Sequence, residues 1–174
     1  MSILNELQEE ALFSSPAIVA TRTIRLCQPY GHYVPPTPIQ DICDKLGVVV
    51  KREDTGINFG KLVYHKSPAT IYLNSRVTKQ TSLDFTMAHL LGHIIFDHSK
   101  INEITESNPV QMEYQSKDPK ELMCQEANKF AVNLLVPGWA LHLYATQSGA
   151  NVNDLIDKFK VSENVIRWQL SYIS

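Results

Sequence analysis

Two histidines placed four residues apart, His89 and His93, are the residues of this chain best suited to chemistry. With about 3.6 residues per helical turn, both imidazoles of such a pair lie on one helix face, one turn apart. Imidazole is a common ligand of divalent transition metals, and two at this spacing can reach one ion. The alternative is that each is a hydrogen-bonded core histidine. The pair therefore indicates a metal site if a third ligand lies close by.

The same spacing occurs in the zinc-peptidase motif H-E-x-x-H, whose glutamate is the general base toward zinc-bound water. Here the glutamate position is Leu90. The sequence keeps the two residues that could hold a metal and lacks the carboxylate that would activate water.

The segment from Ser82 to His98 is predicted to be the helix that carries both histidines. Thr81 and Asp84 suit a capping box, and a long apolar run without proline follows. Because apolar residues cover nearly every side, this helix should be buried. Gly92 is expected to allow a close backbone approach beside the site.

A second strong helix is predicted to begin after Asp118 and to end before Pro137. Glu126 lies one position from its apolar stripe. A carboxylate there is costly to desolvate unless it is paired, and a metal ion is one such partner. A salt bridge or partial exposure is the alternative.

The remaining segments predict a small, largely antiparallel sheet that leads into the histidine helix, and hence an α+β single domain. Three segments have strand composition: Val48–Val50, Lys61–Tyr64 and Thr70–Leu73. Three others have helical periodicity: Ser2–Phe13, Ser15–Gln28 and Thr37–Leu46. The polar run Asn102–Lys117 lacks periodicity, so we expect a long surface loop there.

Composition bounds the function classes. A chain of 174 residues with 44% hydrophobic content can bury a sizeable core, and a net charge of -2 gives no broad basic surface for polyanions. The 3 cysteines form no C-x-x-C pair, which fits a reducing compartment better than a disulfide framework. Without a signal-like start or an apolar run of membrane-spanning length, we expect a soluble cytoplasmic protein.

The C-terminal segment has the pattern of a helix-turn-helix. Asn153–Phe159 and a helix through Tyr172 are joined at Lys160-Val-Ser162. Acidic and basic residues balance along it, whereas a DNA reader usually presents a basic face. We therefore expect these helices to pack within the domain, with specific DNA contact as the alternative.

Two linked motifs make this sequence resemble the ImmA/IrrE family of zinc metallopeptidase domains. The first is His89-Leu-Leu-Gly-His93, and the second is Glu126-Ala-Asn-Lys-Phe-Ala131 followed by Leu134-Leu-Val-Pro137. The resemblance implies a zincin-like fold, with helices at both ends and the sheet packed on the metal-binding helix. It predicts an N-terminal helical extension at residues 1–15 and a metallopeptidase-like domain at residues 16–174.

The resemblance also implies a ligand set and a partner class. One zinc ion would be held by His89, His93 and Glu126, and the general-base position would fall on Leu90. The family acts on helix-turn-helix repressors of stress responses and of mobile elements such as prophages, so it implies a repressor-like transcription regulator as partner.

Three other polar groups lie near these motifs. Cys124, two residues from Glu126, is expected to face away from it and to serve packing. Asp97 and His98 are expected to cap the helix end or to face solvent, because the resemblance already fills three ligand positions. A role for either as an extra ligand, or as a partner of a ligand, is the alternative.

The favoured hypothesis is a regulatory pseudopeptidase that binds a repressor without cutting it. Its partner would add along an edge strand, with Leu90 giving apolar contact and the other contacts from these residues: Lys61, Leu62, Val63, Tyr64, Ile71 and Leu73. The alternatives are an active metallo-endopeptidase with another base and a DNA-binding regulator that uses the C-terminal helices. We expect neither direct nucleic-acid binding nor membrane association, and the oligomeric state is left open.

Overall fold

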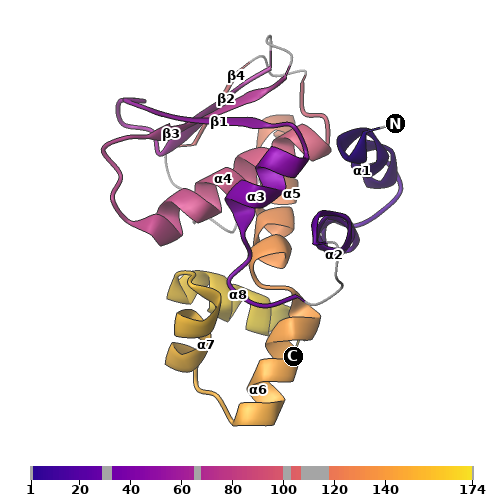
Figure 1. Cartoon of the computed structure of the whole chain (residues 1–174), viewed down its shortest axis with the longest axis vertical. Coiled ribbons are helices and arrows are strands. Elements are labelled where there is room, and N and C mark those ends of the chain that lie inside the picture. Colours follow the sequence, from indigo (N-terminus) through magenta and orange to yellow (C-terminus); the bar gives the residue numbers. More distant parts are fainter. Residues whose placement is uncertain (1, 29–32, 65–67, 100–102, 107–117, 174) are drawn as a thin grey trace.

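The computed structural model describes residues 2–28, 33–64, 68–99, 103–106 and 118–173. At its centre two long helices, α4 (Gln80–Ile95) and α5 (Pro119–Leu135), pack against each other. A sheet covers α4, helices α1 and α2 stand at one flank, and the C-terminal helices lie at the end away from the sheet (Figure 1). The α+β class predicted from the sequence is confirmed.

The two predicted N-terminal helices are present as α1 (Ile3–Ala11) and α2 (Pro16–Cys27). The side chain of Ser2 accepts a hydrogen bond from the Asn5 backbone N–H and so caps α1. Leu7 of α1 is fully buried, and α1 contacts both α2 and α4. The α1 helix is therefore packed onto the same core as the central helices.

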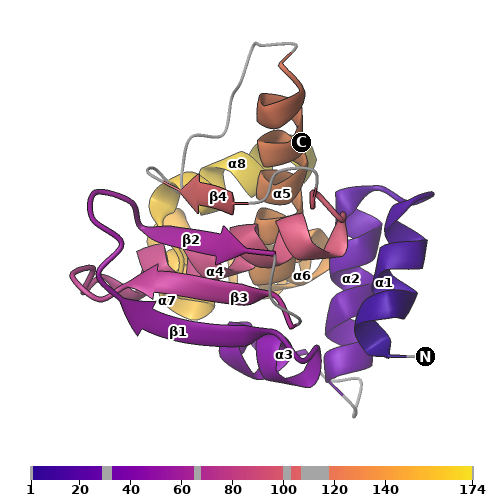
Figure 2. The same cartoon turned by 90° about the horizontal axis from the view of Figure 1, so that it is seen from above.

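The sheet has four strands in the order β1-β3-β2-β4, as Figure 2 shows. Short helix α3 (Ile39–Lys45) leads into the sheet, whose strands are these: β1 (Val49–Glu53), β2 (Gly60–Val63), β3 (Thr70–Asn74) and β4 (Glu103–Glu106). Strand β2 pairs antiparallel with β3 and β4, whereas β1 pairs parallel with β3. The predicted sheet, largely antiparallel, is confirmed.

Strand β4 corrects the expectation of a continuous surface loop at 102–117. Glu103–Glu106 pairs with β2, and Ile104 is buried. Four residues with two terminal glutamates carry too little strand signal to be recognised before the partner strand is known. Residues 107–117 of the predicted loop lie outside the described residues.

Helix α4 is buried on all sides because the sheet covers one face and α5 the other. The predicted capping box at Thr81 and Asp84 is wrong: α4 begins at Gln80 after Lys79, with no side-chain cap, and Asp84 accepts a hydrogen bond from the Gln80 amide. Asp118 caps α5 as predicted, through the backbone N–H of Lys120.

The chain ends in three helices, α6 (Gly138–Ser148), α7 (Val152–Phe159) and α8 (Glu163–Ile173). Helices α7 and α8 were predicted, and α6 was not. The side-chain amide of Gln169 donates hydrogen bonds to Asn133 Oδ1 and to the Val136 carbonyl, which ties α8 to the end of α5. The expected packing of these helices within the domain is confirmed.

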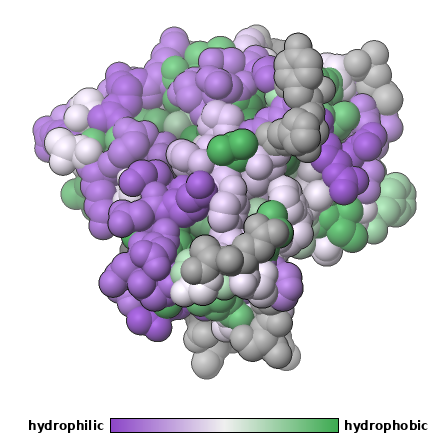
Figure 3. Space-filling view, turned by 60° about the horizontal axis from the view of Figure 1, so that its bottom comes forward, coloured by the Kyte–Doolittle hydropathy of each residue, from purple (hydrophilic) through white to green (hydrophobic). Residues whose placement is uncertain are grey.

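Seen from the end formed by the C-terminal helices, the surface is largely hydrophilic, with hydrophobic residues in small separate groups (Figure 3). Among the described residues, no helix combines the length and apolar character that crossing a bilayer requires.

Candidate metal centre

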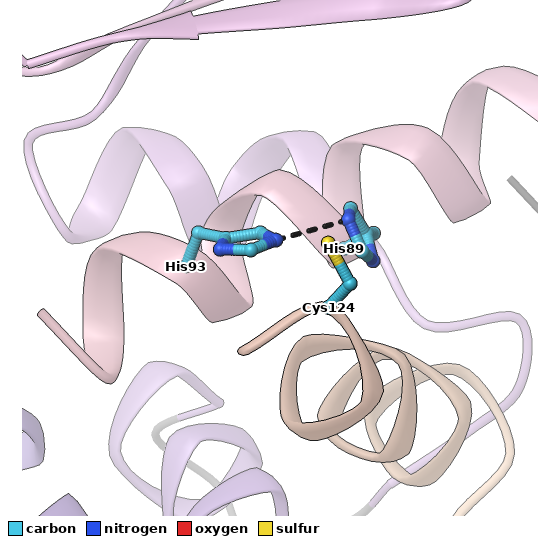
Figure 4. Close-up of side chains that lie close together, drawn as sticks. All are labelled: His89, His93 and Cys124. Atoms are coloured by element: carbon cyan, nitrogen blue, oxygen red, sulfur yellow. Dashed lines mark hydrogen bonds between the residues drawn. The ribbon is translucent and has the colours of Figure 1, made fainter. Parts of the chain in front are cut away.

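Helix α4 brings His89 and His93 together as their spacing predicts. Both side chains are fully buried, and their Nε2 atoms lie 3.1 Å apart (Figure 4). The rings are 4.7 Å apart between centroids and inclined at 71°. Two ligand nitrogens around one zinc ion, each about 2.0–2.1 Å from it, have a similar separation. The pair is therefore arranged to share one ion.

Cys124 on α5 completes this group. The ligand atoms of His89, His93 and Cys124 all lie within 4.8 Å of one another, and Figure 4 shows the thiol beside His89. The role expected of Cys124 is packing, whereas the structure places its thiol in a group of side chains that could hold a metal ion. Cys124 precedes Asn128 by one turn, and Asn128 also contacts His89. Both belong to the α5 face that meets α4. The sequence pattern alone does not predict which face of α5 this is.

Each histidine also has a hydrogen-bond partner on its other ring nitrogen. His89 Nδ1–H donates to Asn128 Oδ1 at 2.7 Å, and His93 Nδ1 is 2.8 Å from His98 Nδ1. Metal-binding histidines commonly have such partners, which fix the tautomer and the ring orientation. His98 is 5% exposed, so the expectation that it faces solvent is wrong.

The end of α4 explains the position of His98. Asp97 takes a left-handed conformation with φ 49°, and the backbone N–H groups of Asp97 and His98 donate to the carbonyls of Ile94 and His93. This is the Schellman arrangement of a helix C-terminus. It turns the chain back on itself, so that the ring of His98 lies against that of His93 with centroids 4.8 Å apart.

Glu126, the third ligand implied by the sequence, contacts His98 instead. Its Oε2 atom is 3.1 Å from His98 Nε2, and its side chain is 41% exposed. Glu126 is absent from the described group of ligand atoms within 4.8 Å, which contains Cys124 in its place. A ligand role for Glu126 stays a prediction.

Comparison with protein families matches residues 43–171 to Peptidase_M78, the IrrE N-terminal-like domain. The chain belongs to this family. The resemblance inferred from the two motifs is thereby confirmed, and the match includes all the residues of the cluster. No curated protein matches the chain.

The fold of this IrrE-like domain is also similar to that of solved structures. A Mycobacterium tuberculosis transcriptional regulator superposes with a TM-score of 0.63 and 19% sequence identity over 97% of this chain. The chain spans only 51% of that regulator's length. At this identity the likeness shows the fold.

The IrrE-like domain presents a donor set that could hold a metal ion. Two imidazoles and a thiol are ligands that zinc accepts in sites with an open fourth position. Burial, together with the neighbouring His89 and His98, lowers the pKa of His93 well below its usual value of 6.5. His93 is therefore neutral near neutral pH, which is the form that binds metals.

Leu90, where the resemblance would place a general base, is part of the core. It is fully buried, and its Cδ1 atom would lie 3.2 Å from a Cβ atom added at Gly60 of β2. Leu90 therefore packs beneath the sheet and offers no surface to a partner.

The predicted partner-binding strands are also interior. β2 and β3 each have a strand on both sides, so their backbone groups already pair within the sheet. Lys61 and Tyr64 are half-buried, and the others are buried: Leu62, Val63, Ile71 and Leu73. The expectation of an open edge along Lys61–Leu73 is wrong, because in the described sheet the edges are β1 and β4.

Proposed function

We propose that this IrrE-like domain binds zinc through His89, His93 and Cys124 and regulates transcription by binding a repressor protein without cutting it. The observation that carries this proposal is the full burial of Leu90, an aliphatic side chain at the position where the family resemblance would place the general base. Bound zinc would supply Lewis acidity at its open position and would lower the pKa of a water held there.

Hydrolysis also needs a group that takes and delivers protons, and such a group typically contributes about 100- to 10,000-fold in rate. Glu126 is paired with His98, and Asp97 is exposed beyond the end of α4. In the part of the chain that the structure describes, neither carboxylate joins the group formed by the two histidines and Cys124. The cluster therefore supports metal binding better than peptidase activity.

The peptidase hypothesis is tested with zinc-loaded protein and a library of quenched fluorescent peptides. We expect no cleavage above that of the His93→Ala variant, which lacks a ligand and controls for contaminating proteases. Cleavage that chelation abolishes and that is missing from His93→Ala would overturn the pseudopeptidase proposal. Metal content measured on the same preparations tests the zinc part separately, with one ion per chain expected in the wild type.

A repressor segment would pair with strand β4, because it is an edge strand and follows the metal helix closely in the chain. Photo-crosslinking in the native host, with the reactive amino acid at Thr105 of β4, should capture a transcription regulator. Lys51 on the opposite edge strand β1 is the matched control position. Capture from Lys51 alone would move the partner to the other edge.

DNA binding through α7 and α8 has weaker support. The only basic residue of α8 is Arg167, and Glu163 pairs with it at 2.6 Å. Retarded migration of DNA by the purified protein, lost in an Arg167→Ala variant, would favour that alternative.

A further inference from the structure

We propose that Glu126 acts on the metal site through His98, as the carboxylate of a hydrogen-bonded pair that orients His93. This inference rests on the proposed metal centre and deepens it. It gives Glu126 a positioning role in place of the ligand role implied by the family motif.

Glu126, His98 and His93 are linked in a row, and the carboxylate at one end sets the direction of the hydrogen bonds. A carboxylate only accepts, so His98 Nε2–H donates a hydrogen bond to Glu126 Oε2 across 3.1 Å. In neutral His98 the Nδ1 atom is then an acceptor, and it accepts from His93 Nδ1–H across 2.8 Å. This tautomer of His93 turns its Nε2 lone pair toward His89.

Asn128 sets the tautomer of His89 in the same way from the other end, because its Oδ1 accepts from His89 Nδ1–H. The two Nε2 atoms then face each other at 3.1 Å as two electron-pair donors. A cation between them satisfies both. The outer partners therefore prepare the two rings for an ion that each ring binds through Nε2.

The surroundings of His98 hold its ring in the orientation that links Glu126 to His93. The residue is 5% exposed and follows the left-handed turn at Asp97, and its ring stacks on Phe96 at 24° between planes. Glu126, by contrast, lines an open cleft of about 470 Å³. The pair thus reaches from solvent to a fully buried ligand, and its outer member can be changed without disturbing the core.

The experiment titrates metal-free protein with Co²⁺ and with Zn²⁺ and follows the Co²⁺ absorption spectrum, which reports the ligands. The variants are Glu126→Gln, His98→Gln and the double variant, with Glu163→Gln on α8 as a matched change of charge far from the site. We expect the wild type and Glu163→Gln to bind one ion with a thiolate-to-cobalt band. Each single variant should keep that band and bind about 10- to 100-fold more weakly.

The double variant separates a positioning role from independent effects. If Glu126 acts through His98, Glu126→Gln has no further effect once His98 is glutamine. Unchanged affinity in both single variants would overturn the proposal. So would a spectrum of Glu126→Gln that shows the loss of a ligand, because Glu126 would then coordinate the ion directly. A wild-type protein that binds neither metal would remove the metal centre itself and this inference with it, whatever the peptide assay shows.

Discussion

His93 is the residue whose chemistry depends most on its surroundings. Burial and two neighbouring imidazoles lower its pKa well below 6.5, whereas in the unfolded chain it titrates near that value. As the pH falls below about 6.5, the unfolded chain takes up a proton that folded His93 does not accept. Protonation therefore favours the unfolded chain in this range.

We expect the metal-free protein to lose stability as the pH falls from about 7 toward 5. Chemical denaturation at a series of pH values measures this loss. His93→Gln should flatten the dependence. An equal slope in wild type and His93→Gln would show that another group causes it.

At this scale the sequence predicts part of the site. His89, His93 and Leu90 follow from spacing on one helix, which local periodicity determines. Cys124 does not, because its direction depends on how α5 is rotated against α4. His98 depends on the left-handed turn at Asp97, a conformation that non-glycine residues adopt uncommonly.

Among the elements, the contact between α4 and α5 controls the site because the histidines and Cys124 lie on different helices. Gly92 makes the close approach possible, as the sequence predicted. A Cβ atom added there would lie 3.1 Å from the Ala127 Cα and 3.2 Å from its carbonyl oxygen. These are backbone atoms, so the helices themselves would have to separate.

Gly92→Ala should therefore destabilise the fold by about 1–3 kcal/mol through overpacking, despite the gain of about 1 kcal/mol in helix propensity. It should also weaken Co²⁺ binding, because Cys124 moves away from the histidines. Gln80→Ala, at the exposed start of the same helix, should change neither. A stabilised variant with normal metal affinity would show that the helices tolerate the extra methyl group.

The sheet shows why strand topology is harder to predict than helices. The sequence predicts β2 and β3 from their composition, but β4 is short and polar at both ends. Once β4 pairs with β2, the strand expected at the edge becomes interior. Which strand forms the free edge of the sheet therefore depends on the four residues of β4, and their sequence alone only weakly predicts a strand.

At the scale of the whole molecule, measurements of stability can decide whether the N-terminal residues 1–15 are a separate extension or part of the same folding unit. Leu7 of α1 is fully buried, and the Gln8 side chain donates a hydrogen bond to the Ile94 carbonyl at the end of α4. Helix α1 thus contacts the same element that carries the two histidines.

Leu7→Ala should destabilise the entire protein by about 2–5 kcal/mol within one cooperative unfolding transition. Leu12→Ala is the matched control, since Leu12 is 75% exposed in the same segment and should have little effect. Thermal unfolding followed by circular dichroism measures both. A separate early transition for Leu7→Ala would instead support residues 1–15 as an independent extension.

The packing of Leu90 makes a carboxylate difficult to accommodate at this position. A glutamate at this position would place a carboxylate beneath β2, beside Gly60 and Thr86, in space that is closed to water. Burying that charge without a partner costs several kcal/mol, a large part of the stability of a domain. A Leu90→Glu substitution alone would damage the fold before it could provide a general base, so the surroundings would have to change first. The packing of the core around Leu90 therefore opposes the gain of a general base by any single substitution at this position.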